Sequence, residues 1–260
     1  MQFILHSDDF GQNDDTLDAT IECFERGALT SATIMPKMPA TERAVEYALK
    51  HPEFSFGVHL TYVRENDGTP ESPVSPASTI PDLADQDGRF FSSNAIRKRA
   101  LLNTISVEQI AAETSAQIES LQSRGVKISH VDSHGHLHKF APFRKALQQV
   151  LPKFGIQRVR GVQTVYLKKP LKSPTFWLGG IWNRKLKKLF TNPDQFFMPD
   201  TIANPDWPEK IVSILSGNTI EIGVHPGFAE AWRNADRLAV QRFATLAKSK
   251  GHELINWNDI

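Results

Sequence analysis

Short β-rich runs alternate with stretches of helical periodicity along almost the whole chain, and few folds accommodate such a pattern. This alternation is how parallel βα units appear in a sequence. We expect eight strands, over residues 3–7, 31–36, 55–61, 128–133, 158–163, 195–198, 219–225 and 253–257. We expect helices over residues 15–26, 42–50, 107–123, 142–154, 206–216 and 234–250. Asp14 is the expected N-cap of the first helix, and Gly27 follows its expected end.

A regular βα alternation over about 250 residues is typical of a single (β/α) barrel of the TIM-barrel type. The chain has 260 residues with no linker-like segment and no internal repeat, so we expect one domain over residues 1–260. A doubly wound open α/β sheet is the structural alternative. Two segments interrupt the alternation, a Pro-, Asp-, Ser- and Gly-rich stretch over 62–94 and an aromatic, basic stretch over 166–190. We expect both to be insertions at the rim of the barrel.

The composition argues against several classes of protein. Thirty Lys and Arg against 29 Asp and Glu give a net charge of +1, which does not indicate nucleic-acid binding. Cys23 is the only cysteine, which excludes an internal disulfide and a cysteine-based zinc site and favours a cytoplasmic setting. No apolar run approaches the roughly 18 residues of a membrane span, so we expect no transmembrane segment. The nine histidines are conspicuous, because imidazole is a common ligand of catalytic metals.

Residues that can bind metals or move protons follow four of the expected strands, at the point where each strand ends. HSDDFG places Asp8 and Asp9 there, FGVHLT places His59, and EIGVHPG places His225. The fourth group is HVDSHGHLH, residues 130–138, with four histidines and one aspartate. The carboxyl ends of parallel strands share one edge, where α/β barrels and open sheets carry their active sites. We therefore expect the four groups to meet.

The group over residues 130–138 carries the strongest indication of function. In an extended strand, His130, Asp132 and His134 would point to the same face. A histidine that binds a metal commonly donates its second N–H to a carboxylate, and Asp132 is suitably placed for that role. Together with a carboxylate of the DDFG motif, this group predicts a mixed histidine and carboxylate metal site with positions open to water.

Each residue also has a purely structural interpretation. The DD pair could form a turn or cap a helix, and both carboxylates can act in one site only if the regular strand ends there. His59 and His225 could be strand-end histidines bonded to backbone groups, although the Pro-Gly after His225 favours a turn that directs its ring to the rim. We expect His6, His51 and His252 to be structural or surface residues.

Taken together, the motifs resemble those of the YdjC-like carbohydrate deacetylases, a family that includes chitooligosaccharide and hopanoid-associated deacetylases. HSDDFG, LTSATIM, FGVHL, HVDSHGHLH and EIGVHPG occur in the order and approximate spacing of that family, from Phe3 to about Gly227. IPDLADQDGRFF, over 80–91, also resembles a loop of the family. The segment 166–190 is not matched by the resemblance.

The resemblance implies a TIM-barrel-like fold and one divalent metal ion, Mg²⁺ or Zn²⁺. It assigns the metal ligands to Asp9, His59 and His134, the general base to Asp8 and the general acid to His225. Residues implied to support the ligands or contact the substrate are Asp132, His136, His138 and Arg160. The implied reaction removes the N-acetyl group of an acetamido sugar, in a chitooligosaccharide or another N-acetylated glycan or glycolipid, and releases acetate.

Other functions stay open from the sequence. The same site could hydrolyse a phosphoester or a cyclic amide, although no Gly-rich phosphate-binding loop is present. A non-catalytic glycan-binding barrel is a further alternative, but it would be expected to lack a ligand or the base. The segment 166–190 is a surface loop and helix packed on the rim, a lid over the substrate, or an element that contacts anionic lipid. A homodimer is also compatible with the sequence.

Overall fold

The computed structural model describes residues 1–65 and 72–260, and its centre is a seven-stranded parallel sheet. The strand order is β4-β3-β2-β1-β6-β5, and β7 pairs with the first residues of β1. The strands are β1 (Gln2–Phe10), β2 (Ser31–Ile34), β3 (Ser55–Leu60), β4 (Ile128–Ser133), β5 (Gln195–Phe197), β6 (Thr219–Val224) and β7 (Glu253–Ile255). The α-helices are α1 (Asp14–Glu25), α2 (Thr41–Lys50), α3 (Ser93–Leu101), α4 (Val107–Gln122), α5 (Ala141–Val150), α6 (Pro174–Lys187), α7 (Trp207–Lys210) and α8 (Ala231–Ser249). Short 3-10 helices are η1 (Ala77–Thr79), η2 (His134–Lys139), η3 (Leu151–Phe154), η4 (Ile211–Ile214) and η5 (Trp257–Asp259).

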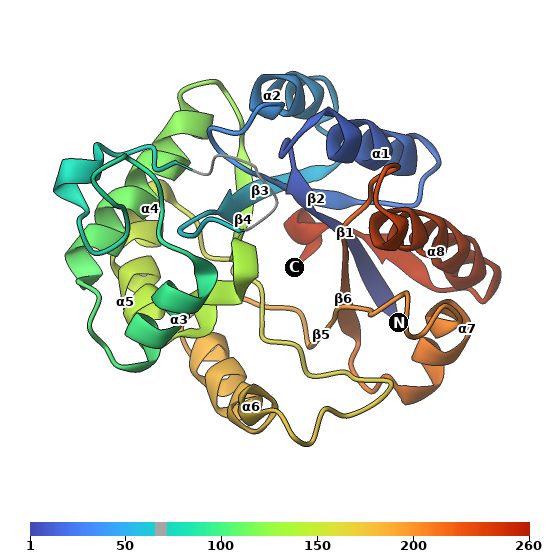
Figure 1. Cartoon of the computed structure of the whole chain (residues 1–260). Coiled ribbons are helices and arrows are strands. Elements are labelled where there is room, and N and C mark those ends of the chain that lie inside the picture. The colour runs from blue at the N-terminus through green and yellow to red at the C-terminus, as the bar shows by residue number, and fades with distance from the viewer. Residues whose placement is uncertain (66–71) are drawn as a thin grey trace.

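The sheet is curled and the helices lie around its outer side (Figure 1), which confirms the α/β class with parallel strands. The prediction of a regular strand over 158–163 is wrong. That segment makes only single parallel bridges, Val131 with Val159 and Arg158 with Thr191. These bridges extend the sheet from β4 toward β5 without adding an eighth regular strand in the described part of the chain. The sheet is therefore a partly closed barrel, and a complete eight-stranded TIM barrel is not confirmed.

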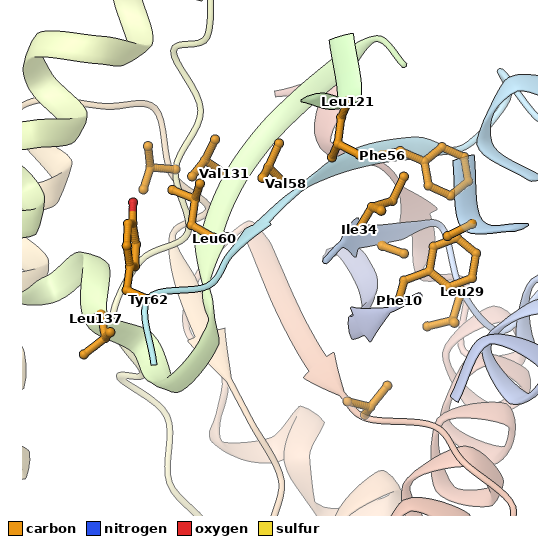
Figure 2. Close-up of a cluster of buried hydrophobic side chains, with 14 of the residues drawn as sticks. Phe10, Leu29, Ile34, Phe56, Val58, Leu60, Tyr62, Leu121, Val131 and Leu137 are labelled. Atoms are coloured by element: carbon orange, nitrogen blue, oxygen red, sulfur yellow. The ribbon is translucent and has the colours of Figure 1, made fainter. Parts of the chain in front are cut away.

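The outer face of the sheet is apolar, because every second residue of each strand points toward the helices. Phe56, Val58 and Leu60 of β3 are buried on this face, and Val131 of β4 continues the row. Figure 2 shows them in one cluster with Leu121 of α4. This apolar layer fixes the helices to the sheet. Among the described residues, none of the helices combines the length and the hydrophobicity of a membrane span.

The inner face of the same strands is polar although it is buried. Its side chains include His6, Ser31, Thr33, His59, His130, Asp132 and Glu221. Strands of parallel sheets are ordinarily apolar on both faces, so this face departs from the structural norm. Gly57 lies within it, where a Cβ atom would come within 2.5 Å of the carbonyl oxygen of His130. At its base, the ring of Trp257 stacks on His130 at 4.3 Å between centroids.

The helices differ from expectation at several places. Asn13, and not Asp14, is the N-cap of α1, since its Oδ1 accepts the backbone N–H of Thr16 at 2.9 Å. The helix expected over 206–216 is split into the short α7 and η4. Helix α3 was not expected, because it buries only a small amount of apolar surface, chiefly at Ile96 and Ala100.

The described part of the segment 62–94 has little regular structure, yet it is packed against α4. The Glu113 carboxylate accepts the backbone N–H groups of Val74 and Ser75, each at 2.9 Å. Ile80 and Leu83 are buried beneath it. Residues 66–71 of this expected insertion lie outside the described residues.

Candidate active site

Asp8 and Asp9 both line one cavity of about 510 Å³, because the C-terminal part of β1 is irregular. The pairing of β1 with β2 changes register between Ser7 and Phe10. Asp9 has a φ of 58°, a left-handed conformation that is uncommon for a residue with a side chain. Two adjacent carboxylates therefore reach the same site, which a regular strand would forbid.

Asp9, His59 and His134 form a compact cluster in the wall of this cavity. The Asp9 Oδ1 atom lies 3.3 Å from Nε2 of His59 and 3.1 Å from Nδ1 of His134. Ligand atoms about 2.0–2.2 Å from a metal ion, at about 90–110° around it, lie about 2.8–3.6 Å apart. The spacing of these three side chains therefore fits a single divalent cation.

Asp132 fixes the orientation of the His59 imidazole. Its Oδ1 lies 2.7 Å from Nδ1 of His59, which leaves Nε2 of that ring directed at Asp9. Burial alone would lower the pKa of His59, but the negative charge of Asp132 and its hydrogen bond raise that pKa to about 10. Asp132 also accepts a hydrogen bond from the hydroxyl of Thr33 at 3.1 Å. It is fully buried and does not line the cavity, so it is placed to orient His59 and not to contact a molecule in the cavity.

Arg160 pairs with three carboxylates in the buried polar interior. Its Nη1 lies 2.7 Å from both Asp8 Oδ2 and Asp132 Oδ2, and its Nη2 lies 2.7 Å from Glu221 Oε1. The resemblance implied that Arg160 supports the ligands or contacts the substrate, but its side chain is wholly buried and does not line the cavity. His6, Asp8 and Asp132 are also close enough for a cation, but the guanidinium of Arg160 already forms ion pairs with both carboxylates.

The environment of Asp8 keeps this carboxylate ionised. Burial alone would raise the pKa of Asp8, but the positive charge of Arg160, followed by that of His225, holds the pKa far below its ordinary value. Its Oδ1 atom is buried and has no hydrogen-bond partner among the described residues, with Nε2 of His6 at 3.6 Å. Asp8 is therefore a carboxylate in the cavity wall with one oxygen that accepts no hydrogen bond from the described residues.

His225 reaches the cavity from the loop that follows β6. Its Nε2 lies 3.7 Å from Asp8 Oδ2, and its Nδ1 lies 3.7 Å from Asp236 Oδ2. The Asp236 carboxylate also accepts the backbone N–H of His225 at 3.0 Å. The His225 side chain is 21% exposed, and its ring meets the edge of Trp232 at 5.5 Å. His225 can therefore contact a molecule in the cavity.

The expectation that His130, Asp132 and His134 share one face is only partly met. Strand β4 ends at Ser133, and His134 belongs to η2, which turns its ring into the cavity. His130 and Asp132 stay in the buried inner layer. The physical reason is that strand periodicity no longer applies once the backbone turns.

His136 and His138 are neighbours in this turn, with ring centroids 6.2 Å apart. His136, with a φ of 55°, lines both the main cavity and a second cavity of about 180 Å³. His138 is buried, lines only the second cavity, and has its Nδ1 2.8 Å from the hydroxyl of Ser133. Burial lowers the pKa of His138 to about 3 and holds the pKa of His136 well below its ordinary value. Both rings are neutral at physiological pH, and only His136 is placed to contact a molecule in the main cavity.

Three residues at the site were missed in the sequence. Arg233 donates to Asp9 Oδ2 at 3.0 Å, Asp236 braces the loop after β6, and Glu65 Oε1 lies 3.8 Å from Nε2 of His134. Arg233 and Asp236 belong to the first turns of α8, which the expected helix over 234–250 did not fully include. The usable signal was the VHPG motif, because the helix after a strand-end loop begins at the same edge of the sheet.

Comparisons with known proteins agree with these motifs. A family model described as "YdjC-like protein" matches residues 2–255. Carbohydrate deacetylases of Geobacillus stearothermophilus and Brevibacillus brevis are each 27% identical, over 87% and 95% of this chain and 80% and 90% of their own. The carbohydrate deacetylase of Listeria monocytogenes serotype 4a is 30% identical over 73% of this chain and 74% of its own.

A solved structure shows the same fold. It is the crystal structure of an Enterococcus faecalis V583 protein that has been proposed to cleave cellobiose phosphate. The match covers 99% of this chain and 98% of that one, with a TM-score of 0.78 and 20% identity. At this identity the similarity supports the arrangement of strands and helices alone.

Proposed function

This chain belongs to the YdjC-like protein family, and we propose that it is a metal-dependent carbohydrate deacetylase. The proposed reaction hydrolyses the N-acetyl group of an acetamido sugar and releases acetate. Relatives named carbohydrate deacetylase support this proposal. The observation that carries it is the presence of Asp8, Asp9, His59, His134 and His225 around one cavity.

Asp9, His59 and His134 are the proposed ligands of one divalent cation, Mg²⁺ or Zn²⁺. When bound, this cation would supply a Lewis acid for the acetamide carbonyl. The residues around the ligands limit their movement. Asp132 orients His59, and Arg233 holds the second oxygen of Asp9. Fixed partners of this kind support metal ligands in many proteins.

Two residues of the cavity are proposed to move protons. Asp8 would accept a proton from the attacking water, and its ionised state is maintained by Arg160. His225 would donate a proton to the departing amine, because an amide nitrogen leaves poorly unless it is protonated. Asp236 acts through His225 as a positioning residue, since it holds the backbone of that loop.

Acetate release from chitobiose and other N-acetylglucosamine oligomers, with magnesium, zinc or cobalt added, tests this proposal. Asp8→Asn and His225→Ala are each expected to lower kcat by about 10² to 10⁴ while the bound metal stays unchanged. His134→Ala is expected to remove the metal as well. His51→Ala, which alters a surface histidine paired with Glu53, is the matched control. Wild-type turnover by Asp8→Asn would overturn the assignment of the base.

We also propose a cytoplasmic location. Cys23 is buried and unpaired, as is usual for cysteines of proteins in reducing compartments.

A further inference from the structure

Helix α6 carries an apolar patch on the side that faces away from the sheet. Trp177, Leu178 and Ile181 are 64%, 37% and 47% exposed. Leu171, which is 59% exposed, lies beside them, because the indole N–H of Trp177 donates to its carbonyl oxygen at 2.9 Å. We call these four residues the α6 patch. Exposed apolar groups gathered in this way usually mark a surface that binds something.

The opposite side of α6 is fixed to the rest of the fold. Leu186 is fully buried, and the ring of Trp182 packs edge-on against Phe140 at 5.2 Å between centroids. The side-chain oxygen of Asn183 accepts the backbone N–H of Val162 at 3.0 Å. One face of α6 is therefore packed against the rest of the fold, and the α6 patch is exposed on the other face.

Exposed basic residues precede and follow the α6 patch in the chain. The segment 166–190 contains no acid, and its basic residues, all exposed, are Lys168, Lys169, Lys172, Arg184, Lys185, Lys187 and Lys188. The rest of the chain has the opposite balance, with 23 basic and 29 acidic residues. An apolar stripe with an exposed tryptophan and a basic border matches the boundary of an anionic bilayer. There, indole rings lie at the level of the headgroups and each basic residue is attracted to lipid phosphate.

The α6 patch is also close to the candidate active site. The second cavity lies between η2 and the start of the 166–190 segment, and its lining includes Tyr166, Thr175 and Phe176. His136 lines this cavity and the main cavity as well. The second cavity therefore lies beside the main cavity, on the side where α6 begins.

We propose that α6 and the loop before it bind the surface of an anionic lipid bilayer and thereby bring membrane-anchored acetamido sugars to the active site. This inference rests on the deacetylase function proposed above and specifies its substrate class as sugars linked to lipid. Surface attachment by a single amphipathic helix is reversible and requires no membrane-spanning segment.

Co-sedimentation with phosphatidylcholine vesicles, with and without phosphatidylglycerol, tests whether the protein binds an anionic bilayer. The protein is expected to bind the anionic vesicles at low salt and to be released by high salt. The double variants Trp177→Ser with Ile181→Ser and Arg184→Gln with Lys185→Gln are each expected to weaken binding by more than about tenfold.

Two matched variants remove the same kinds of group elsewhere on the surface. Leu101→Ser with Leu102→Ser alters two exposed leucines of the α3 region, and Lys127→Gln with Lys145→Gln removes two exposed charges. Both are expected to bind like the unaltered protein. Absence of binding at low salt, equal binding to neutral vesicles, or equal losses in these controls would overturn the inference.

Acetate release from two substrates separates this inference from the deacetylase proposal. The α6 variants are expected to process soluble chitobiose at the unaltered rate, but to release acetate from vesicles carrying lipid-linked N-acetylglucosamine more than about tenfold more slowly. Turnover of soluble substrate without vesicle binding would overturn the bilayer inference alone. Vesicle binding without acetate release from either substrate would overturn the deacetylase function and the substrate class, and leave the bilayer contact standing.

Discussion

His59 and Asp132 are direct neighbours across the β3–β4 ladder, and their side chains meet with Nδ1 of the imidazole 2.7 Å from a carboxylate oxygen. Both residues are buried on the inner face of the sheet. The register of two parallel strands thus fixes the direction of a proposed metal ligand, with Nδ1 of His59 facing Asp132. The pair links the motifs FGVHLT and HVDSHGHLH, which lie about seventy residues apart in the sequence.

Asp132→Asn is expected to weaken metal binding by about 10- to 100-fold, because the amide no longer accepts strongly from His59 while its size is kept. A titration against a chelator of known affinity measures this change, with circular dichroism to show that the fold persists. Glu53→Gln is the control, since it alters a similar pair with His51 at the surface. Unchanged metal affinity in Asp132→Asn would show that the pair does not support the site.

Arg160→Met is expected to lower the free energy of unfolding by about 3–5 kcal/mol, because it leaves Asp8, Asp132 and Glu221 buried without their counter-charge. Urea denaturation followed by circular dichroism measures the effect. The double variant Arg160→Met with Glu221→Gln is expected to lose less of the free energy of unfolding, since one of the uncompensated carboxylates is then removed.

Arg43→Met is the matched control for Arg160, because Arg43 bonds to Asp14 and Asp18 at the exposed surface. Such surface ion pairs contribute little to stability, so little change is expected. Similar losses in the Arg43 and Arg160 variants would contradict the role given to the buried network.

The sequence was sufficient to bring Asp8, Asp9, His59, His134 and His225 to one place. The reason is geometric, because parallel strands end at a common edge and each of these residues lies at or directly after the C-terminal end of a strand. The reasoning needed no distances, only the βα alternation.

The charged residues that support the site, Glu221 and Arg233, could not be predicted in the same way. Glu221 lies within an apolar strand and Arg233 within a helix rich in polar residues, and nothing local distinguishes them from ordinary solvated side chains. Their roles depend on Arg160 and Asp9, which are distant in sequence. The strand expected over 158–163 does not form a regular ladder for a related reason. Strand propensity does not determine whether a neighbouring strand is present to pair along its whole length.

Gly57→Ala is expected to destabilise the protein by about 1–3 kcal/mol, because the new methyl group would lie 2.5 Å from the His130 carbonyl oxygen and 2.8 Å from its ring. Thermal unfolding measures the loss. Gly180→Ala is the control, since nothing lies within 4 Å of the added atom and alanine favours helix α6. Equal stability of the two variants would contradict the close approach of β3 and β4.

Cys23 is expected to resist alkylation in the folded protein. Burial raises the pKa of its thiol to about 11 from an ordinary value of 9.0, so at pH 8 its thiolate fraction is about 100-fold lower than that of an exposed cysteine. Its sulfur is also enclosed between α1 and α8, where Gln241 Nε2 lies 3.6 Å away. Mass spectrometry after iodoacetamide treatment is expected to show no label in buffer and complete label in urea.

A variant with Cys23→Ser and Leu102→Cys provides the control for the alkylation, because position 102 is 64% exposed and is expected to react without urea. Rapid labelling of Cys23 in buffer would mean that α1 and α8 separate readily. That result would contradict the packing described here, because the N-terminal turn of α8 also supplies Arg233 to Asp9 and Asp236 to His225. Protection of Cys23 therefore reports on the same helix contact that shapes one side of the active site.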